Sequence, residues 1–185
     1  MIYVFLATGF EDIETLAPLD ILRRAGLNVE TVSVTGDEIV KSAHGVSVVA
    51  DNVIENVDFE DADMIVLPGG MPGASNLDAC EELLQGILCH YKAGRPLAAI
   101  CAAPMVYGHL GILQGRRATC YPGFESELKG AQYTAALVEQ DGPFITGRGP
   151  AAAMEFGYTL AEHFVGKEAV QALRDGMMYT QLMSE

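Results

Sequence analysis

Cys101 is the residue with the clearest capacity for chemistry in this sequence. It directly follows the apolar run Leu97–Ile100, which predicts a buried strand, and it precedes Ala102, Ala103 and Pro104. A reactive side chain on a tight strand-to-helix turn needs small neighbours, and the following helix directs backbone N–H groups and its positive end towards that side chain. The pattern therefore predicts a nucleophile elbow with a thiol of lowered pKa. The alternative is a buried cysteine that acts only as a small apolar residue.

Two other segments at the ends of predicted strands carry groups that suit the same site. Glu14 follows the first predicted strand, and Gly69 and Gly70 follow another apolar run. In an open α/β sheet, ligands bind beyond the carboxyl ends of the strands, so we expect these groups to meet Cys101 in one crevice. The N–H groups of Gly70 and Ala102 would then form an oxyanion hole. The alternative is a glycine pair that only permits a tight turn.

Glu14 can assist a thiolate only as a neutral acid. An ionised carboxylate would raise the thiol pKa by like-charge repulsion, whereas burial can keep a carboxyl group protonated. A neutral acid beside Cys101 could stabilise a thiolate, move a proton to and from a substrate, or hydrogen-bond an oxidised sulfur. The alternative is that Glu14 interacts with the dipole of a helix start in solvent.

Composition excludes several classes of function. The 185 residues predict a single domain over 1–185. A formal net charge of −14 argues against binding to nucleic acid or to an anionic membrane. The apolar start lacks a basic region, and the longest apolar stretch, 96–113, is too interrupted by proline and glycine to span a bilayer, so we expect a cytoplasmic protein. The four cysteines and four histidines have neither disulfide nor zinc-site spacing, and we expect no metal and no cofactor.

Apolar runs alternate with helical patterns along the chain, which predicts a flavodoxin-like α/β open sandwich with a mostly parallel sheet, helices on both faces and a hairpin near 39–49. The predicted strands are Ile2–Ala7, Val29–Val34, Val46–Val49, Met64–Leu67, Leu97–Ile100, Arg117–Thr119, Ala136–Val138 and Phe144–Thr146. The predicted helices are Thr15–Ala25, Ala74–Ala93, Ala103–His109, Pro150–Phe164 and Lys167–Met178.

Five segments of the chain carry a recognisable family pattern: 7–14, 20–26, 66–70, 98–104 and 147–150. Together they resemble the ThiJ/PfpI superfamily, and more closely its branch of the parkinsonism-associated protein deglycase and its bacterial relatives. The resemblance implies a flavodoxin-like sandwich, a homodimer, Cys101 as nucleophile, Glu14 as the protonated acid bonded to it, and an oxyanion hole from Gly70 and Ala102. It also implies activity on α-oxoaldehydes such as methylglyoxal or on their early protein adducts, as in a glyoxalase III or a deglycase.

Departures from the family pattern narrow this expectation. Cys101 is followed by Ala102 rather than by the His of the intracellular-protease branch, which argues against a peptidase. Tyr121 stands where the human relative has a His, and His44 stands where the family often has Arg. Arg148 keeps the Arg-Gly-Pro pattern and would orient a polar substrate or form a loop salt bridge. The expected substrate-binding residues are Gly69, Arg148, Tyr121 and His44.

A second class of function uses the same thiol. An accessible cysteine beside a hydrogen-bond donor suits stepwise oxidation, so Cys101 could serve a redox sensor or an oxidative-stress chaperone. The sequence does not separate this reading from the enzyme. A role in thiazole monophosphate biosynthesis ranks below both, because the chain has no basic phosphate cradle.

Overall fold

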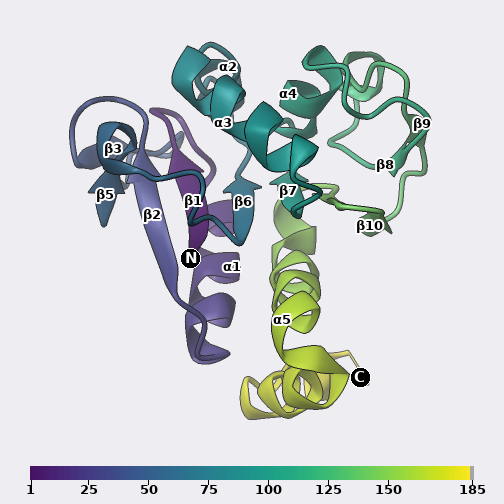
Figure 1. Cartoon of the computed structure of the whole chain (residues 1–185). Coiled ribbons are helices and arrows are strands. Elements are labelled where there is room, and N and C mark those ends of the chain that lie inside the picture. The colour runs from purple at the N-terminus through teal and green to yellow at the C-terminus, as the bar shows by residue number, and fades with distance from the viewer. Residues whose placement is uncertain (184–185) are drawn as a thin grey trace.

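The computed structural model describes residues 1–183 and is built on a seven-stranded sheet in the order β10-β11-β7-β6-β1-β2-β5 (Figure 1). All neighbouring strands are parallel except β10, which pairs antiparallel with β11. This confirms the predicted α/β fold with a mostly parallel sheet. The strands are β1 (Ile2–Leu6), β2 (Val29–Ser33), β5 (Asn52–Val53), β6 (Met64–Leu67), β7 (Leu97–Ile100), β10 (Val138–Asp141) and β11 (Phe144–Gly147).

The four central strands are buried along their whole length. Every residue of β1, β6, β7 and β11 is buried, which explains why these segments are continuous apolar runs and not alternating patterns. The helices that cover the sheet are α1 (Asp12–Arg24), α2 (Gly73–Asp78), α3 (Glu81–Lys92), α4 (Pro104–His109), α5 (Ala153–Gly176) and α6 (Tyr179–Leu182).

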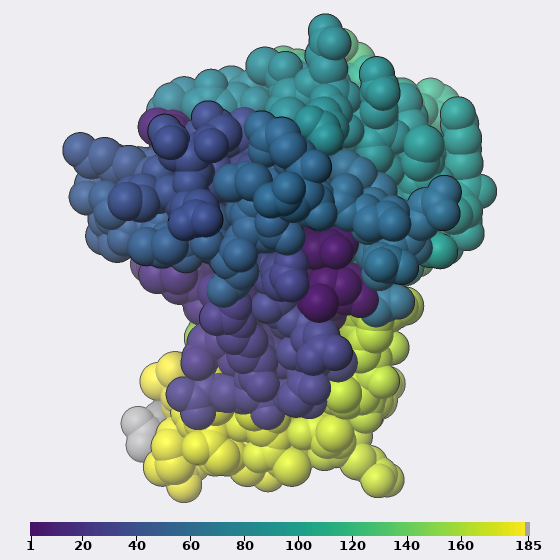
Figure 2. Space-filling model, turned by 60° about the vertical axis from the view of Figure 1, so that its left-hand side comes forward, coloured from purple at the N-terminus to yellow at the C-terminus, as the bar shows by residue number. Residues whose placement is uncertain are grey.

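Helices α1 and α5 pack against each other at one end of the molecule (Figures 1 and 2). Gly157 allows this approach, because a Cβ atom there would lie 2.9 Å from the Cα atom of Pro18. Helix α2 contacts both α3 and α4, and these three helices lie towards the other end. Among residues 1–183, no helix combines the length and the apolar character needed to cross a bilayer.

Two of the predicted helices differ from the structure for a clear local reason. The predicted helix Ala74–Ala93 is two helices, because the chain is extended at Cys80 (ψ 98°). The acidic pair Glu81 and Glu82 follows, and acidic residues favour a new helix start. Helix α1 begins at Asp12, earlier than the predicted Thr15, because the Glu11 side chain caps its N-terminus.

The remaining elements are short. The predicted hairpin is present as β3 (Ile39–Lys41) and β4 (Ser47–Val49), while the strand predicted at Ala136–Val138 lies at β10 instead. Helix α5 joins most of the predicted helices Pro150–Phe164 and Lys167–Met178, with a kink at Gly166 between them, but it begins at Ala153 and ends at Gly176. A parallel pair of short strands and three single 3-10 turns complete the chain: β8 (Arg117–Ala118), β9 (Gln132–Tyr133), η1 (Ile54–Asn56), η2 (Glu125–Glu127) and η3 (Pro150–Ala152).

Candidate active site

Cys101 occupies the turn between β7 and α4 with a left-handed backbone, φ 66°. Few residues other than glycine adopt this conformation, and where they do the surrounding structure must hold them. Here the Cys101 N–H donates to the Gly147 carbonyl at 2.9 Å, and the Cys101 carbonyl accepts from the Tyr121 N–H at 2.8 Å. The side chain is 8% exposed. The geometry is that of the predicted elbow.

Gly69 permits the closest approach in the site. A Cβ atom on Gly69 would lie 2.6 Å from the Cys101 Cβ atom and 2.6 Å from the Glu14 Oε2 atom. Gly70 has a positive φ of 87°, and a Cβ atom there would lie 2.5 Å from the Glu11 backbone nitrogen. The two glycines therefore do more than permit a turn, because they bring three segments of the chain into backbone contact.

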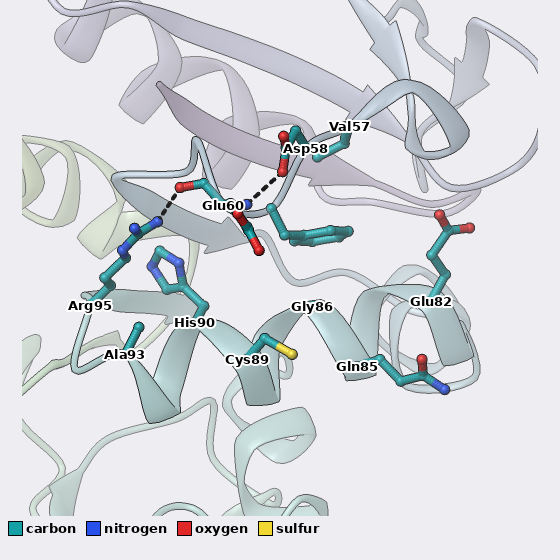
Figure 3. A pocket seen from close by; sticks show the side chains of 11 residues that line it. Val57, Asp58, Glu60, Glu82, Gln85, Gly86, Cys89, His90, Ala93 and Arg95 are labelled. Atoms are coloured by element: carbon teal, nitrogen blue, oxygen red, sulfur yellow. Dashed lines mark hydrogen bonds between the residues drawn. The ribbon is translucent and has the colours of Figure 1, made fainter.

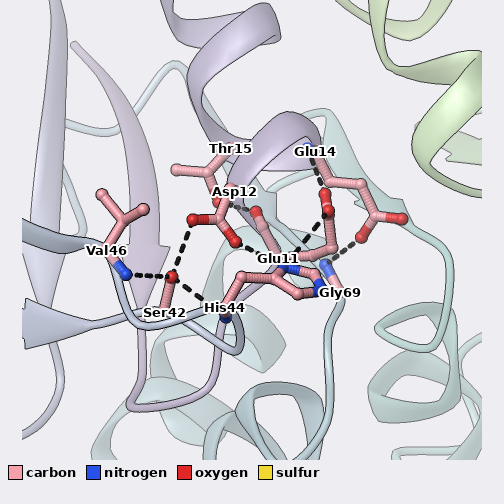
Figure 4. A network of polar contacts seen from close by, with 8 residues as sticks. All are labelled: Glu11, Asp12, Glu14, Thr15, Ser42, His44, Val46 and Gly69. Carbon is pink, nitrogen blue, oxygen red and sulfur yellow. Dashed lines mark hydrogen bonds and ion pairs between the residues drawn. The ribbon is translucent and has the colours of Figure 1, made fainter.

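Glu14 is 1% exposed and faces Cys101 from the first turn of α1. Its Oε2 atom accepts the Gly69 N–H at 3.1 Å, while its buried Oε1 atom makes no hydrogen bond of standard geometry within residues 1–183 (Figure 4). Burial is the main cause that raises the Glu14 pKa to about 7; the neighbouring Cys101 thiol opposes the rise and the Glu11 charge adds to it. At neutral pH this carboxyl group therefore holds or releases a proton with little change in free energy.

The Cys101 thiol has a raised pKa, so the expectation of a lowered one is wrong for the resting site. Burial is the largest cause and the Glu14 charge and hydrogen bond add to it. Hydrogen bonding from the backbone N–H groups of Gly70 and Ala102 acts in the opposite direction and lowers this pKa. Because two negative charges in one buried site repel, a thiolate here requires that Glu14 carry the proton.

Glu11 is a site residue that the sequence analysis missed. Its Oε2 atom accepts the Glu14 N–H at 2.7 Å, so Glu11 caps the N-terminus of α1 in the turn that carries Glu14. A carboxylate three residues before a helical position is a known capping signal, although Asp and Ser are the commoner caps. That spacing could have identified it.

His44 belongs to a polar network at the exposed end of the same helix turn. Its Nδ1 atom lies 2.8 Å from Asp12 Oδ2, and the Ser42 hydroxyl donates to Asp12 Oδ1 at 2.7 Å (Figure 4). The hydrogen bond with Asp12 raises the His44 pKa. Partial burial raises the Asp12 pKa, but the bonds from Ser42 and His44 outweigh it and lower that pKa.

This network also contains a potential set of metal ligands. One atom each from Glu11, Asp12 and His44 lies within 4.8 Å of the others. Both Asp12 oxygens already accept hydrogen bonds, and the positive end of α1 lies at the same place. The hydrogen bonds account for the cluster, and we assign no metal to it.

Tyr121 and Arg148 line one apolar recess of about 180 Å³, together with Leu137 and Pro150. The Arg148 Nη1 atom donates to the Ala135 carbonyl at 2.7 Å, which supports the turn before β10. The structure thus ties Tyr121 to Cys101 through the backbone and gives Arg148 a structural bond. Contact of either side chain with a substrate stays a prediction.

A separate cavity of about 600 Å³ lies between α3 and the segment after η1 (Figure 3). Its walls include Phe59, Glu60, Cys89, His90 and Arg95, and none of its lining residues was predicted to be in the site. The Arg95 guanidinium donates to the Glu60 carbonyl across one end. The candidate site residues Cys101, Glu14, Gly69 and Gly70 converge elsewhere, at the carboxyl ends of β1, β6 and β7.

Comparison with known proteins agrees with this fold. The model of the DJ-1/PfpI family matches residues 1–163. The Drosophila melanogaster protein dj-1beta is 37% identical over 178 residues, which is 95% of each chain. The glutathione-independent glyoxalase DJR-1.2 of Caenorhabditis elegans is 33% identical over 165 residues, which is 88% of this chain and 87% of the relative.

Longer relatives and solved structures extend the comparison. Protein DJ-1 homolog B of Arabidopsis thaliana is 40% identical over 88% of this chain, and the chain spans only 38% of that relative's length. The solved structure of oxidised DJ-1 from Toxoplasma gondii superposes with a TM-score of 0.92 and 35% identity, over 96% of this chain and 97% of the other.

Proposed function

Since the chain belongs to the DJ-1/PfpI family, we propose that it is a cysteine-dependent enzyme that converts α-oxoaldehydes such as methylglyoxal, or their early adducts on amines and thiols, into 2-hydroxy acids. The observation that carries the proposal is a buried carboxyl group with a pKa near 7 that faces a cysteine on an elbow. A relative with the name of a glutathione-independent glyoxalase supports it. Peptidase activity has no support, because Ala102 follows the nucleophile.

The first step is addition of sulfur to the aldehyde carbon. The Cys101 proton moves to Glu14 as the C–S bond forms, and the carbonyl π electrons move to oxygen. In this proposal the Gly70 and Ala102 N–H groups, whose hydrogen bonding acts to lower the Cys101 pKa, donate to that oxygen. The product is a hemithioacetal, with the charge on oxygen neutralised by the proton that Glu14 received.

The second step moves a proton between two carbons. Glu14, now ionised, removes the hydrogen from the former aldehyde carbon and returns it to the adjacent carbon through an enediol, while the hydroxyl proton on the former aldehyde carbon moves to the oxygen on the adjacent carbon. The first carbon is oxidised and the second is reduced, so the thioester forms with no external redox partner. Water then cleaves the thioester to a 2-hydroxy acid and the free thiol. This sequence needs neither glutathione nor a metal.

Substrate selection is proposed for the residues around the elbow. Gly69 lets its loop pack against Cys101 and Glu14. Tyr121 and Arg148 offer an apolar wall and a cation at the neighbouring recess. His44 offers a second cation at the exposed end of α1. We also propose that the enzyme is a homodimer that handles small aldehydes or glycated side chains and binds no nucleic acid or membrane.

The direct test is lactate formation from methylglyoxal by metal-free protein without glutathione. Cys101→Ser should lower kcat by at least about 1000-fold, because it removes the nucleophile. Glu14→Gln should lower kcat by about 100- to 10,000-fold, because it removes the proton carrier. Asp12→Asn is the matched control on the same helix turn. An active Cys101→Ser variant would exclude this mechanism.

A redox sensor is the second candidate, and one observation favours it. The carboxyl group of Glu14 that faces the Cys101 thiol can hydrogen-bond an oxidised sulfur when protonated, and a similar solved structure is described as oxidised. Mass spectrometry after graded peroxide treatment tests it. Oxidation spread evenly over Cys80, Cys89, Cys101 and Cys120 would count against a dedicated sensor.

A further inference from the structure

His109, the last residue of α4, lies between two carboxylates. Its Nδ1 atom is 2.8 Å from Asp78 Oδ2, and its Nε2 atom is 2.8 Å from Glu127 Oε2. A neutral imidazole has one N–H group, so two carboxylate acceptors are satisfied together only by the imidazolium ion. The geometry therefore selects the charged form of His109.

The three residues belong to segments that each start at the candidate active site. Helix α4 follows Cys101 and the oxyanion donor at 102, whereas α2, which ends at Asp78, follows the Gly69–Gly70 loop. Glu127 ends η2, six residues after Tyr121, whose N–H donates to the Cys101 carbonyl. His109 thus joins the far ends of the three segments that carry the parts of the site.

The junction is packed as well as charged. A Cβ atom on Gly108 would lie 2.0 Å from the Glu127 carbonyl oxygen, so the backbone of η2 rests directly on α4. Leu128 is 3% exposed beside it. The side chains of His109 and Asp78 are 29% and 24% exposed, and that of Glu127 is 40% exposed.

The charged groups around His109 favour its protonation. The hydrogen bond with Glu127 is the main cause that raises the His109 pKa; burial opposes it, Asp78 adds to it and the Lys129 charge opposes it. The same bond lowers the Glu127 pKa. Since the folded-state pKa is raised, the stabilisation is complete below the ordinary histidine range and is lost as pH rises through the folded-state value.

We propose that His109 is a pH-sensitive positioning residue: its imidazolium ion holds α2, α4 and η2 together behind Cys101, and loss of its proton releases η2. Glu127 is released before Asp78, because it is more exposed and water replaces its bond more readily. The chain between Tyr121 and Glu127 then loosens, and with it one backbone support of Cys101. The effect on turnover rests on the proposed function, whereas the release of η2 does not.

Glu127→Gln tests whether the link between His109 and η2 depends on the His109 proton. The introduced amide accepts a bond from the imidazolium ion and, after rotation, donates one to the neutral ring, so the link survives loss of the proton. Amide hydrogen exchange over 121–128, corrected for the intrinsic effect of pH, is measured at pH 6 and at pH 8.5. Nitrogen-15 NMR of the ring reports how many protons His109 carries, and His163→Gln is the control at an exposed histidine.

In the wild type and in His163→Gln, protection of 121–128 should fall by about fivefold between these pH values, in line with a partly exposed ion pair. In Glu127→Gln the protection of 121–128 should not fall between these pH values. The decline of methylglyoxal turnover on the alkaline side of its pH profile should shift in the same variant. If turnover is absent in the wild type, exchange and NMR still decide. An equal loss of protection in Glu127→Gln, or a singly protonated His109 ring at pH 6, would overturn the proposal. If Glu127→Gln does not fold, Asp78→Asn repeats the test.

Discussion

Two carboxyl groups in the first turn of α1 have pKa values that are shifted in opposite directions. Glu14 is 1% exposed, and its burial raises its pKa to about 7. Asp12, two residues earlier, lies at the exposed end, where bonds from Ser42 and His44 lower its pKa against the effect of partial burial. A step of two residues turns the helix by about 200°, so Glu14 faces the core while Asp12 faces the opposite side. The surroundings of each group, more than its residue type, decide whether it can carry a proton to a thiol.

Gly69→Ala should have the largest effect, because it disturbs the buried pair of Glu14 and Cys101. The added Cβ atom meets the Cys101 Cβ atom and the Glu14 Oε2 atom at 2.6 Å each, so the thiol and the acid must move apart. We expect kcat/KM for methylglyoxal to fall by about 100-fold, as for an ångström-scale misplacement of reacting groups. Steady-state kinetics measure it. Gly176→Ala is the control, because no atom lies within 4 Å of its Cβ position; equal activity of the two variants would contradict the packing argument.

Glu14 should also make the stability of the protein depend on pH. Its folded-state pKa of about 7 exceeds the ordinary value of 4.5, so the folded chain binds this proton more tightly than the unfolded chain. The contribution is complete below pH 4.5 and is lost as pH rises through 7, and its size is about 3 kcal/mol because the group is buried.

Glu14→Gln keeps an acceptor for the Gly69 N–H but cannot ionise. At pH 8 its melting temperature should exceed that of the wild type by about 5 to 10 °C, and the two should converge near pH 4.5. Thermal unfolding followed by circular dichroism measures this. Glu168→Gln, at an exposed helix position, should behave as the wild type does. A variant that loses activity and gains no stability at pH 8 would show that Glu14 is not strained in its charged form.

Asp12→Asn and His44→Gln should have the smallest effect. They test the exposed end of the first turn of α1. Each removes an exposed ion pair while the Glu11 cap at the start of α1 stays in place. We expect kcat to stay within about threefold of the wild-type value and any larger change to appear in KM, because His44 is proposed to act on substrate approach. Kinetics at low and high salt measure it. A loss as large as that of Glu14→Gln would mean that the two ends of the turn act as one unit.

Local patterns in the sequence predicted much of the site before any coordinates. The run Leu97–Ile100, the small residues after Cys101 and the glycine loop after β6 are short-range signals, and parallel strands bring their carboxyl ends to one edge. Glu14 was found for the same reason. The break at Cys80 was missed, because a continuous helical stripe of apolar residues does not reveal a change of helix direction.

The sequence by itself determined the alternation of strands and helices, the elbow at Cys101 and the glycine loop expected beside it. That Gly69 must lack a Cβ atom was decided by the tertiary structure. The tertiary structure decided the protonation of these groups, because a pKa depends on burial and on charges brought from distant parts of the chain. It also decided that Arg148 bonds to a carbonyl and that His109 joins Asp78 and Glu127, which are 31 and 18 residues away from it. Such contacts leave no periodic signal, since each depends on where whole elements pack.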